Sequence, residues 1–197
     1  MKNKIIIVCL SVIMLLSLVS CTKPITDDEA RAILEELIPK AEIINDIVWG
    51  VGLDIEPGQD EALNTVTAAQ YRTVAKNSPY QSTEELKAAI AEVYSDAFIA
   101  NTIEYACFTG ADDALENTEA QMYPRYADGN DGVLVVDITN KGFELTTKID
   151  PASAKVVSAK RGKQNIEVKA TVGGEETTLI IVLVQQESGW RLDTPTY

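Results

Sequence analysis

The sequence predicts an α+β fold, in which N-terminal helices pack on one face of a curved antiparallel sheet of about five strands. Three observations predict it. Apolar residues recur at helical spacing up to about residue 108. Beyond Gly132 they alternate with polar residues or form short runs between turn residues, as strands do. Apolar residues make up 46% of the 197 residues and charged residues 24%, which is typical of a globular protein.

The charge balance excludes several classes of function. The chain carries 30 Asp and Glu, 17 Lys and Arg and no His, for a formal net charge of −13. A nucleic-acid partner is excluded, because phosphate binding depends on cations. The absence of His excludes Ser-His-Asp and Cys-His catalysis and His-ligated zinc. No Walker A, GxSxG, HExxH or CxxC motif occurs, so we expect no cofactor, no metal and no catalytic residue.

Residues 1–20 are expected to direct the chain across the cytoplasmic membrane. A basic start is followed by fifteen mostly apolar residues without charge, Ile5–Val19. This pattern is typical of a secretory signal peptide, and the run is shorter than the roughly 20 residues of a transmembrane helix. It ends in Leu18-Val19-Ser20-Cys21, which resembles a bacterial lipobox. The resemblance implies cleavage before Cys21 and a lipid on its thiol, which would anchor the protein to the outer face of the cytoplasmic membrane. An uncleaved membrane helix is the alternative.

Residues 21–26 would then be a short tether and residues 27–197 a single domain, whose helical half spans 27–108. Thr26 and Glu29 match a capping box at the start of the first helix. Helical spacing of apolar residues predicts one bent helix or two abutting helices over 27–48, because Pro39 interrupts the pattern.

Further signals in the helical half predict a short strand and two more helices. Residues 71–76 fit a short strand or a packed extended segment. Ser82 with Glu85 forms a second capping-box pattern and predicts a helix over 83–94. A polar N-cap pair, Ser95-Asp96, predicts another helix over 96–108.

Cys107 lies within the last of these helical patterns. We expect it to be a buried small hydrophobe. The alternative, a thiol nucleophile, would need an activating base, and the chain has no His.

The last third of the chain predicts a β-meander over 132–197. The Gly173-Gly174 pair between two apolar patterns indicates a tight hairpin. The segments that predict strands are the apolar run 133–136, the alternation at Phe143 and Leu145, and residues 155–160, 166–172, 179–184 and 190–192.

Short motifs along the chain carry a resemblance to known proteins. They are Pro39 with Asn45 and Val48-Trp49-Gly50-Val51-Gly52-Leu53, then Tyr71-x-x-Val74, Ser82-x-x-Glu85-Leu86-Lys87, Val93-Tyr94-Ser95 and the closing Gly189-Trp190-Arg191-Leu192-Asp193-Thr194-Pro195-Thr196-Tyr197. These motifs resemble lipoproteins of Gram-positive bacteria. Their layout is similar to that of the IseA-type inhibitors of cell-wall DL-endopeptidases and of the NTF2-like/cystatin-like superfold. The resemblance implies a cone-shaped fold and binding to a peptidoglycan hydrolase. No inhibitory residue can be matched.

The charge is concentrated in one half of the chain. Residues 22–132 carry 22 acidic and 7 basic side chains, whereas residues 133–197 carry 8 of each. A polar loop is expected over 109–131, and we expect it to face a partner. The residues expected to make this contact are Asp112, Asp113, Glu116, Glu119, Tyr123 and Tyr126.

These acids have two other interpretations. The carboxylates of 109–131 could form a general acid–base set, but acids spaced in this way usually lie on solvated surfaces. The cluster from Asp128 to Asp131 is similar to a calcium loop, yet Gly132 and Thr139 stand where an EF-hand needs ligands. A solvated turn is therefore the prediction for that cluster.

The sequence thus predicts a lipid-anchored extracytoplasmic binding protein that inhibits a cell-wall hydrolase. Its expected partners are the membrane, through the lipid on Cys21, and that hydrolase. The alternatives are an envelope protein that holds a small ligand in an NTF2-like pocket, and an enzyme built on carboxylates.

Overall fold

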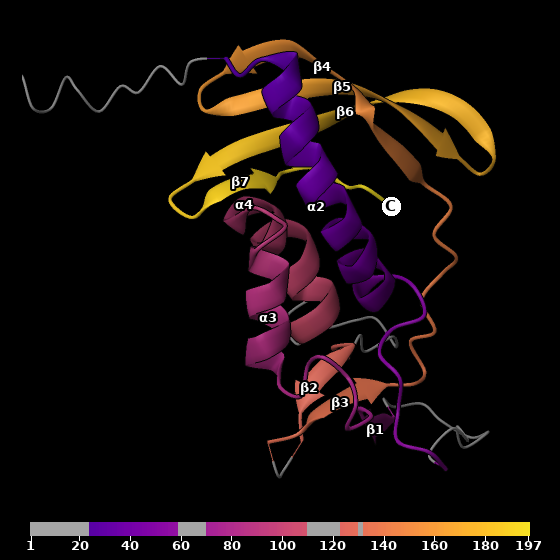
Figure 1. Ribbon diagram of the computed structural model, residues 1–197. Coiled ribbons are helices and arrows are strands. Elements are labelled where there is room, and N and C mark those ends of the chain that lie inside the picture. The colour runs from indigo at the N-terminus through magenta and orange to yellow at the C-terminus, as the bar shows by residue number, and fades with distance from the viewer. Residues whose placement is uncertain (1–23, 59–69, 110–122, 130–131) are drawn as a thin grey trace, which may run out of the picture.

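The computed structural model describes residues 24–58, 70–109, 123–129 and 132–197 (Figure 1). It confirms the α+β class. The described residues form a few helices and two antiparallel sheets, one of three strands and one of four, and neither sheet closes into a barrel. Among the same residues, no helix combines the length and apolar character that crossing a bilayer requires.

The long helix α2 (Asp27–Val48) begins at the predicted capping box. The Thr26 hydroxyl accepts a hydrogen bond from the Glu29 N–H at 3.2 Å, and the Glu29 carboxylate accepts one from the Thr26 N–H at 2.7 Å. Pro39 lies inside α2 without ending it, so the single helix is the correct alternative. One face of the helix is buried along its whole length, which stabilises it despite the hydrogen bond that Pro39 cannot make.

The larger sheet consists of four consecutive strands in the order β4-β5-β6-β7, and α2 crosses one of its faces, as predicted (Figure 1). Buried Ile166, Val168, Ile181 and Leu183 alternate with more exposed residues and point toward the helix. The predicted Gly-Gly hairpin joins β5 and β6, and both glycines adopt the positive φ that the turn requires. The strands are β4 (Lys148–Lys160), β5 (Lys163–Val172), β6 (Glu175–Gln186) and β7 (Gly189–Leu192).

The smaller sheet corrects the prediction of one meander. The apolar run expected at 133–136 forms β3 (Leu134–Asp137), but β3 pairs with β1 (Tyr71–Thr73) and β2 (Tyr126–Asp128) rather than with β4. β1 confirms the short strand expected within 71–76. β2 lies inside the segment expected to be a loop, 109–131.

Residues 138–147 connect the two sheets and form no strand, which corrects the prediction for Phe143 and Leu145. Gly142 has a φ of 64°, and a Cβ there would lie 2.0 Å from the Gly50 carbonyl oxygen. The Phe143 N–H donates to the Trp49 carbonyl at 2.8 Å. The connection is therefore bonded to the end of α2, and the Phe143 N–H is not available for a sheet.

Of the remaining helices, α3 is shorter than predicted, and the helical stretch after it is less regular than predicted. Ser82 caps α3 (Thr83–Ala91), while the Glu85 carboxylate accepts from the N–H of Gln81 rather than of Ser82. The helix expected over 96–108 begins at Ser95 as predicted but is mostly a π-helix. Its segments are α4 (Asp96–Phe98), η1 (Ile99–Ile103) and η2 (Tyr105–Thr109).

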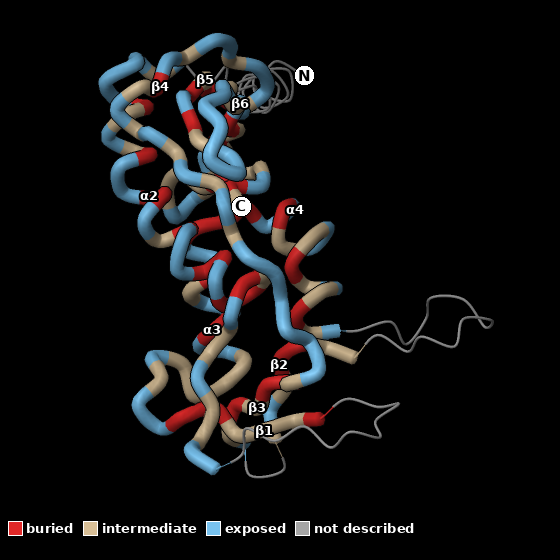
Figure 2. Tube along the Cα trace, turned by 90° about the vertical axis from the view of Figure 1, so that its right-hand side faces the viewer, coloured by how far each residue is buried: buried red, intermediate tan, exposed pale blue. Residues whose placement is uncertain are grey.

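One hydrophobic core joins these parts. Figure 2 shows buried positions along α2 and at both sheets. The core cluster contains Leu34 of α2, Leu86 of α3, Leu134 of the smaller sheet and Ile166 of the larger sheet, each fully buried. The junction between the two sheets, at the end of α2, is where the conspicuous sequence motifs meet.

Candidate functional site

The predicted lipidation site, Cys21, and the predicted partner-facing residues have different outcomes. Cys21 and four acids, Asp112, Asp113, Glu116 and Glu119, lie outside the described residues. Tyr123 is half-buried. Tyr126 is 0% exposed, which corrects the prediction that it faces a partner. Its hydroxyl donates to the Ile47 carbonyl at 2.9 Å and accepts from the Leu53 N–H at 3.1 Å, so it holds the end of α2 from within.

A buried polar triad brings the motif residues together. The Tyr94 hydroxyl donates to Asn45 Oδ1 at 2.6 Å and lies 2.8 Å from Thr196 Oγ1. Asn45 Nδ2 donates to the same Thr196 oxygen at 2.9 Å. All three side chains are buried, so these bonds fix the C-terminal segment against α2. Burial raises the pKa of Tyr94 to about 12, so at neutral pH its hydroxyl is a hydrogen-bond donor rather than a nucleophile.

Arg125 closes the C-terminal end of α2. This side chain is buried, and its guanidinium donates to the Val48 carbonyl at 2.8 Å and to the Gly50 carbonyl at 2.6 Å. The negative end of the helix dipole favours a cation here. Gly52 has a φ of 89°, and a Cβ on it would lie 2.7 Å from the guanidinium, so the close approach requires glycine.

Three aromatic rings form the surface of this junction. The ring of Trp49 lies 5.2 Å from that of Tyr197, which in turn lies 6.2 Å from Phe143. Phe143 is 53% exposed, and Trp49 and Tyr197 are half-buried. We call these three residues the junction patch. Val51, next to it in the chain, is 83% exposed.

A small hollow of about 190 Å³ opens beside Tyr197. Glu42 and Asp46, on exposed positions of α2, line it together with Leu145 and Lys148. Burial raises the pKa of the Tyr197 hydroxyl, which therefore stays protonated and can donate a hydrogen bond. The junction patch thus combines rigid aromatic rings with acidic neighbours, an arrangement suited to binding.

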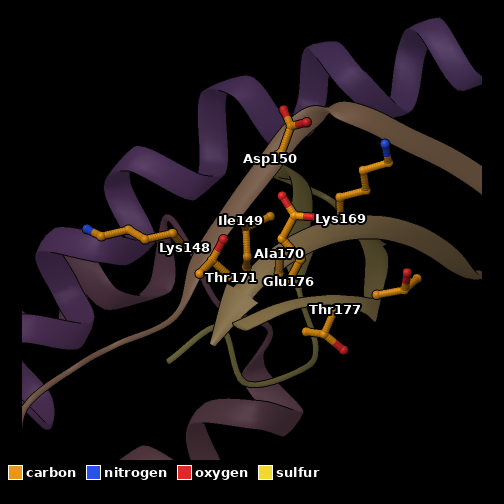
Figure 3. A pocket seen from close by; sticks show the side chains of 9 residues that line it. Lys148, Ile149, Asp150, Lys169, Ala170, Thr171, Glu176 and Thr177 are labelled. Atoms are coloured by element: carbon orange, nitrogen blue, oxygen red, sulfur yellow. The ribbon is translucent and has the colours of Figure 1, made fainter. Parts of the chain in front are cut away.

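A larger hollow of about 460 Å³ lies on the four-stranded sheet (Figure 3). Its charged side chains, Lys148, Asp150, Lys169 and Glu176, have both signs and come from three neighbouring strands. The hollow is not under α2, where Leu34, Ile166 and Ile181 fill the space between helix and sheet.

Two observations on the described residues concern chemistry that the sequence had raised. Cys107 is fully buried, which confirms the expected small hydrophobe, and burial raises its pKa to about 12, so it remains a thiol. Within the described ranges, no group of three His, Cys, Asp or Glu is placed to hold a metal ion.

Comparison with known proteins adds no family. No protein-family model matches the chain, and no curated protein is significantly similar to it.

The sequence indicates the motifs around Trp49 and Tyr197 but not their contact. Trp49 and Tyr197 are distant in sequence, and their pairing depends on the return of the chain from β7 to α2. For Arg125 one signal was available: it is the only cation in the acidic stretch 109–131. The last turn of α2 has no basic residue of its own. An isolated cation elsewhere in the sequence is therefore a candidate to bind the carbonyl groups at that helix end.

Proposed function

We propose that this protein is a lipid-anchored, extracytoplasmic binding protein that docks on a cell-wall hydrolase through the junction patch and inhibits it. The observation that carries the docking site is the trio of aromatic rings at the end of α2. Aromatic side chains dominate the energetics of protein interfaces, because they bury a large area and lose little conformational entropy.

The junction patch is held in place before any partner arrives. The buried triad fixes Thr196, the neighbour of Tyr197, and the Phe143 N–H is bonded to the Trp49 carbonyl. A rigid aromatic surface needs no ordering on binding, and this lowers the entropic cost of association.

The acidic side chains of α2 favour a partner with a basic surface. The exposed side of α2 that leads to the junction patch carries Glu35, Glu42 and Asp46, and a fourth acid, Glu36, forms an ion pair with Lys40. Acids opposite a basic surface would steer the encounter. Neutralising Asp112, Asp113, Glu116 and Glu119 is also expected to weaken partner binding, as the sequence predicts.

The hydrolase, the lipid on Cys21 and the NTF2-like or cystatin-like assignment rest on sequence resemblance. One helix crossing a four-stranded antiparallel sheet is compatible with that assignment. The second candidate function, binding of a small ligand, would use the polar hollow of about 460 Å³ on the sheet, because the space under α2 is filled.

The test is a titration of the protein into a turnover assay of purified DL-endopeptidases on peptidoglycan. The proposal expects saturable inhibition that follows direct binding. Unchanged turnover at saturating protein would show that the protein is not an inhibitor of these enzymes. Binding of a small polar ligand that Lys169→Ala abolishes would favour the second function instead.

A further inference from the structure

Strand β4 and the turn after it are basic, in contrast to the rest of the molecule. Residues 148–163 carry five basic side chains and one acid, Asp150, in a chain whose net charge is −13. All five are exposed, although Lys163 forms an ion pair with Asp193. The five are Lys148, Lys155, Lys160, Arg161 and Lys163.

The part of this basic segment from Lys155 onward lies at the end of the molecule from which the tether leaves, whereas Lys148 lies at the other end of β4, beside Tyr197. The Asp27 carboxylate, in the first turn of α2, accepts a hydrogen bond from the Val156 N–H of β4 at 2.8 Å. Figure 1 shows the first described residues beside the turn between β4 and β5. Cys21 precedes Pro24 by three residues, which limits their separation to about 11 Å.

The acids at the same end are largely engaged. Asp27 accepts from the backbone of β4, Asp28 forms an ion pair with Arg31, and the Glu29 carboxylate caps α2. Glu167 lies opposite Lys155 in the β4–β5 pairing, and Glu187 is exposed in the turn between β6 and β7. The net positive charge of the β4–β5 turn therefore comes from Lys160 and Arg161.

β4 is an edge strand. Among the described residues, no strand pairs with its outer side. Irregular pairing with β5 occurs near Pro151 and between Val156 and Ser158. The second irregularity leaves Val157 50% exposed, beside the basic residues. An apolar side chain flanked by cations is typical of surfaces that lie on anionic lipid.

We propose that the outer edge of β4 and the β4–β5 turn lie on the anionic headgroups of the membrane that carries the lipid anchor, with Val157 at the contact. This inference rests on the proposed lipid on Cys21. It orients α2 away from the membrane and holds the junction patch at its far end toward the cell wall. Basic residues on an edge strand also discourage aggregation. Protection against aggregation needs charge of either sign, whereas lipid contact needs positive charge. A variant with reversed charge therefore separates these two roles.

The experiment uses the full lipidated protein in vesicles with quencher-bearing headgroups. A fluorescent maleimide is attached at Val157→Cys or, as a control at the far end, at exposed Asn77→Cys. Cys107 is fully buried and does not take the label. We expect the probe at position 157 to be quenched in phosphatidylglycerol vesicles about threefold more than in phosphatidylcholine vesicles, and high salt to remove the difference. The probe at position 77 should be unaffected.

The variant Lys155→Glu, Lys160→Glu, Arg161→Glu keeps the edge charged and reverses its sign, so it should abolish the quenching. A matched control variant makes the same charge change elsewhere in the protein, and its probe at position 157 should be quenched as in the parent. This control is Lys76→Glu, Lys87→Glu, Lys141→Glu. An anchored protein whose probe at position 157 is not quenched, or a reversed variant that is quenched like the parent, overturns the contact. A protein that does not float with vesicles overturns the anchor, and the contact with it. Neither result bears on hydrolase inhibition, which is measured in solution.

Discussion

Tyr94 donates its buried hydroxyl to Oδ1 of Asn45 across 2.6 Å and thereby bonds the segment after α3 to the last turns of α2. Thr196 is hydrogen-bonded to both side chains, so the three residues together also fix the C-terminal segment that carries Tyr197. The position of the junction patch thus depends on a buried polar triad.

Removing the Tyr94 hydroxyl tests that dependence. Tyr94→Phe leaves Asn45 Oδ1 buried without its donor, and we expect the free energy of unfolding to fall by about 1–3 kcal/mol. Urea denaturation measures it, with Tyr105→Phe at an exposed position as the control. Equal stability of Tyr94→Phe and the parent would show that the triad does not stabilise the junction.

We expect Arg125 to stabilise the fold, although its position in an acidic stretch of the sequence does not indicate this. Arg125→Met keeps the apolar stem but leaves the carbonyls of Val48 and Gly50 without their donor, so we expect a loss of about 2–3 kcal/mol. The matched control is Arg161→Met in the exposed β4–β5 turn. The account of the helix end is wrong if both variants denature at the same urea concentration.

A buried amide provides a prediction of the opposite sign. Gln164 is 0% exposed, and neither of its amide atoms has a hydrogen-bond partner among the described residues. Gln164→Met has a similar volume and removes the desolvated amide, so we expect stability to rise by about 1 kcal/mol. Thermal and urea unfolding measure it. A destabilised variant would contradict the unpaired state of the amide.

Alkaline pH should destabilise the fold. Burial raises the pKa of Cys107 from 9.0 to about 12 and those of Tyr94 and Tyr126 from 10.0 to about 12. The folded state holds these protons more tightly. The resulting stability is complete below the unfolded pKa and is lost as pH rises through the folded value. We expect the free energy of unfolding to fall from about pH 9 to about pH 12.

Cys107→Ala separates the thiol from the tyrosines. In this variant the decline in stability should begin near pH 10 instead of about pH 9, because only the tyrosine hydroxyls remain to be deprotonated. Urea denaturation at a series of pH values measures the onset. An onset that does not move would show that Cys107 is not held as a buried thiol.

Local signals in the sequence predicted local structure well. The capping box of Thr26 and Glu29 fixes the start of α2 through bonds three residues apart, and Gly173-Gly174 requires only its own backbone freedom. The failures are non-local. The alternation at Phe143 and Leu145 has strand character, but the Phe143 N–H is bonded to the end of α2. The run at 133–136 is a strand, yet it pairs with β1 and with β2, and β2 lies in the segment predicted to be a loop.

The candidate site could be predicted only in pieces. The sequence indicated the motifs around Trp49 and Tyr197, but no local pattern reveals that their rings meet. Tyr126 was expected on the surface because its neighbours are polar, and it is buried because β2 inserts it beneath the end of α2.

The most direct test of the junction patch compares two exposed apolar residues in the hydrolase inhibition assay. Phe143 lies in the patch and Ile180 on the larger sheet, and they are 53% and 48% exposed. Docking through the patch predicts that Phe143→Ala weakens inhibition by at least about tenfold, the loss expected of an aromatic anchor, while Ile180→Ala inhibits as the parent does. Equal inhibition by Phe143→Ala and the parent would contradict docking through the junction patch.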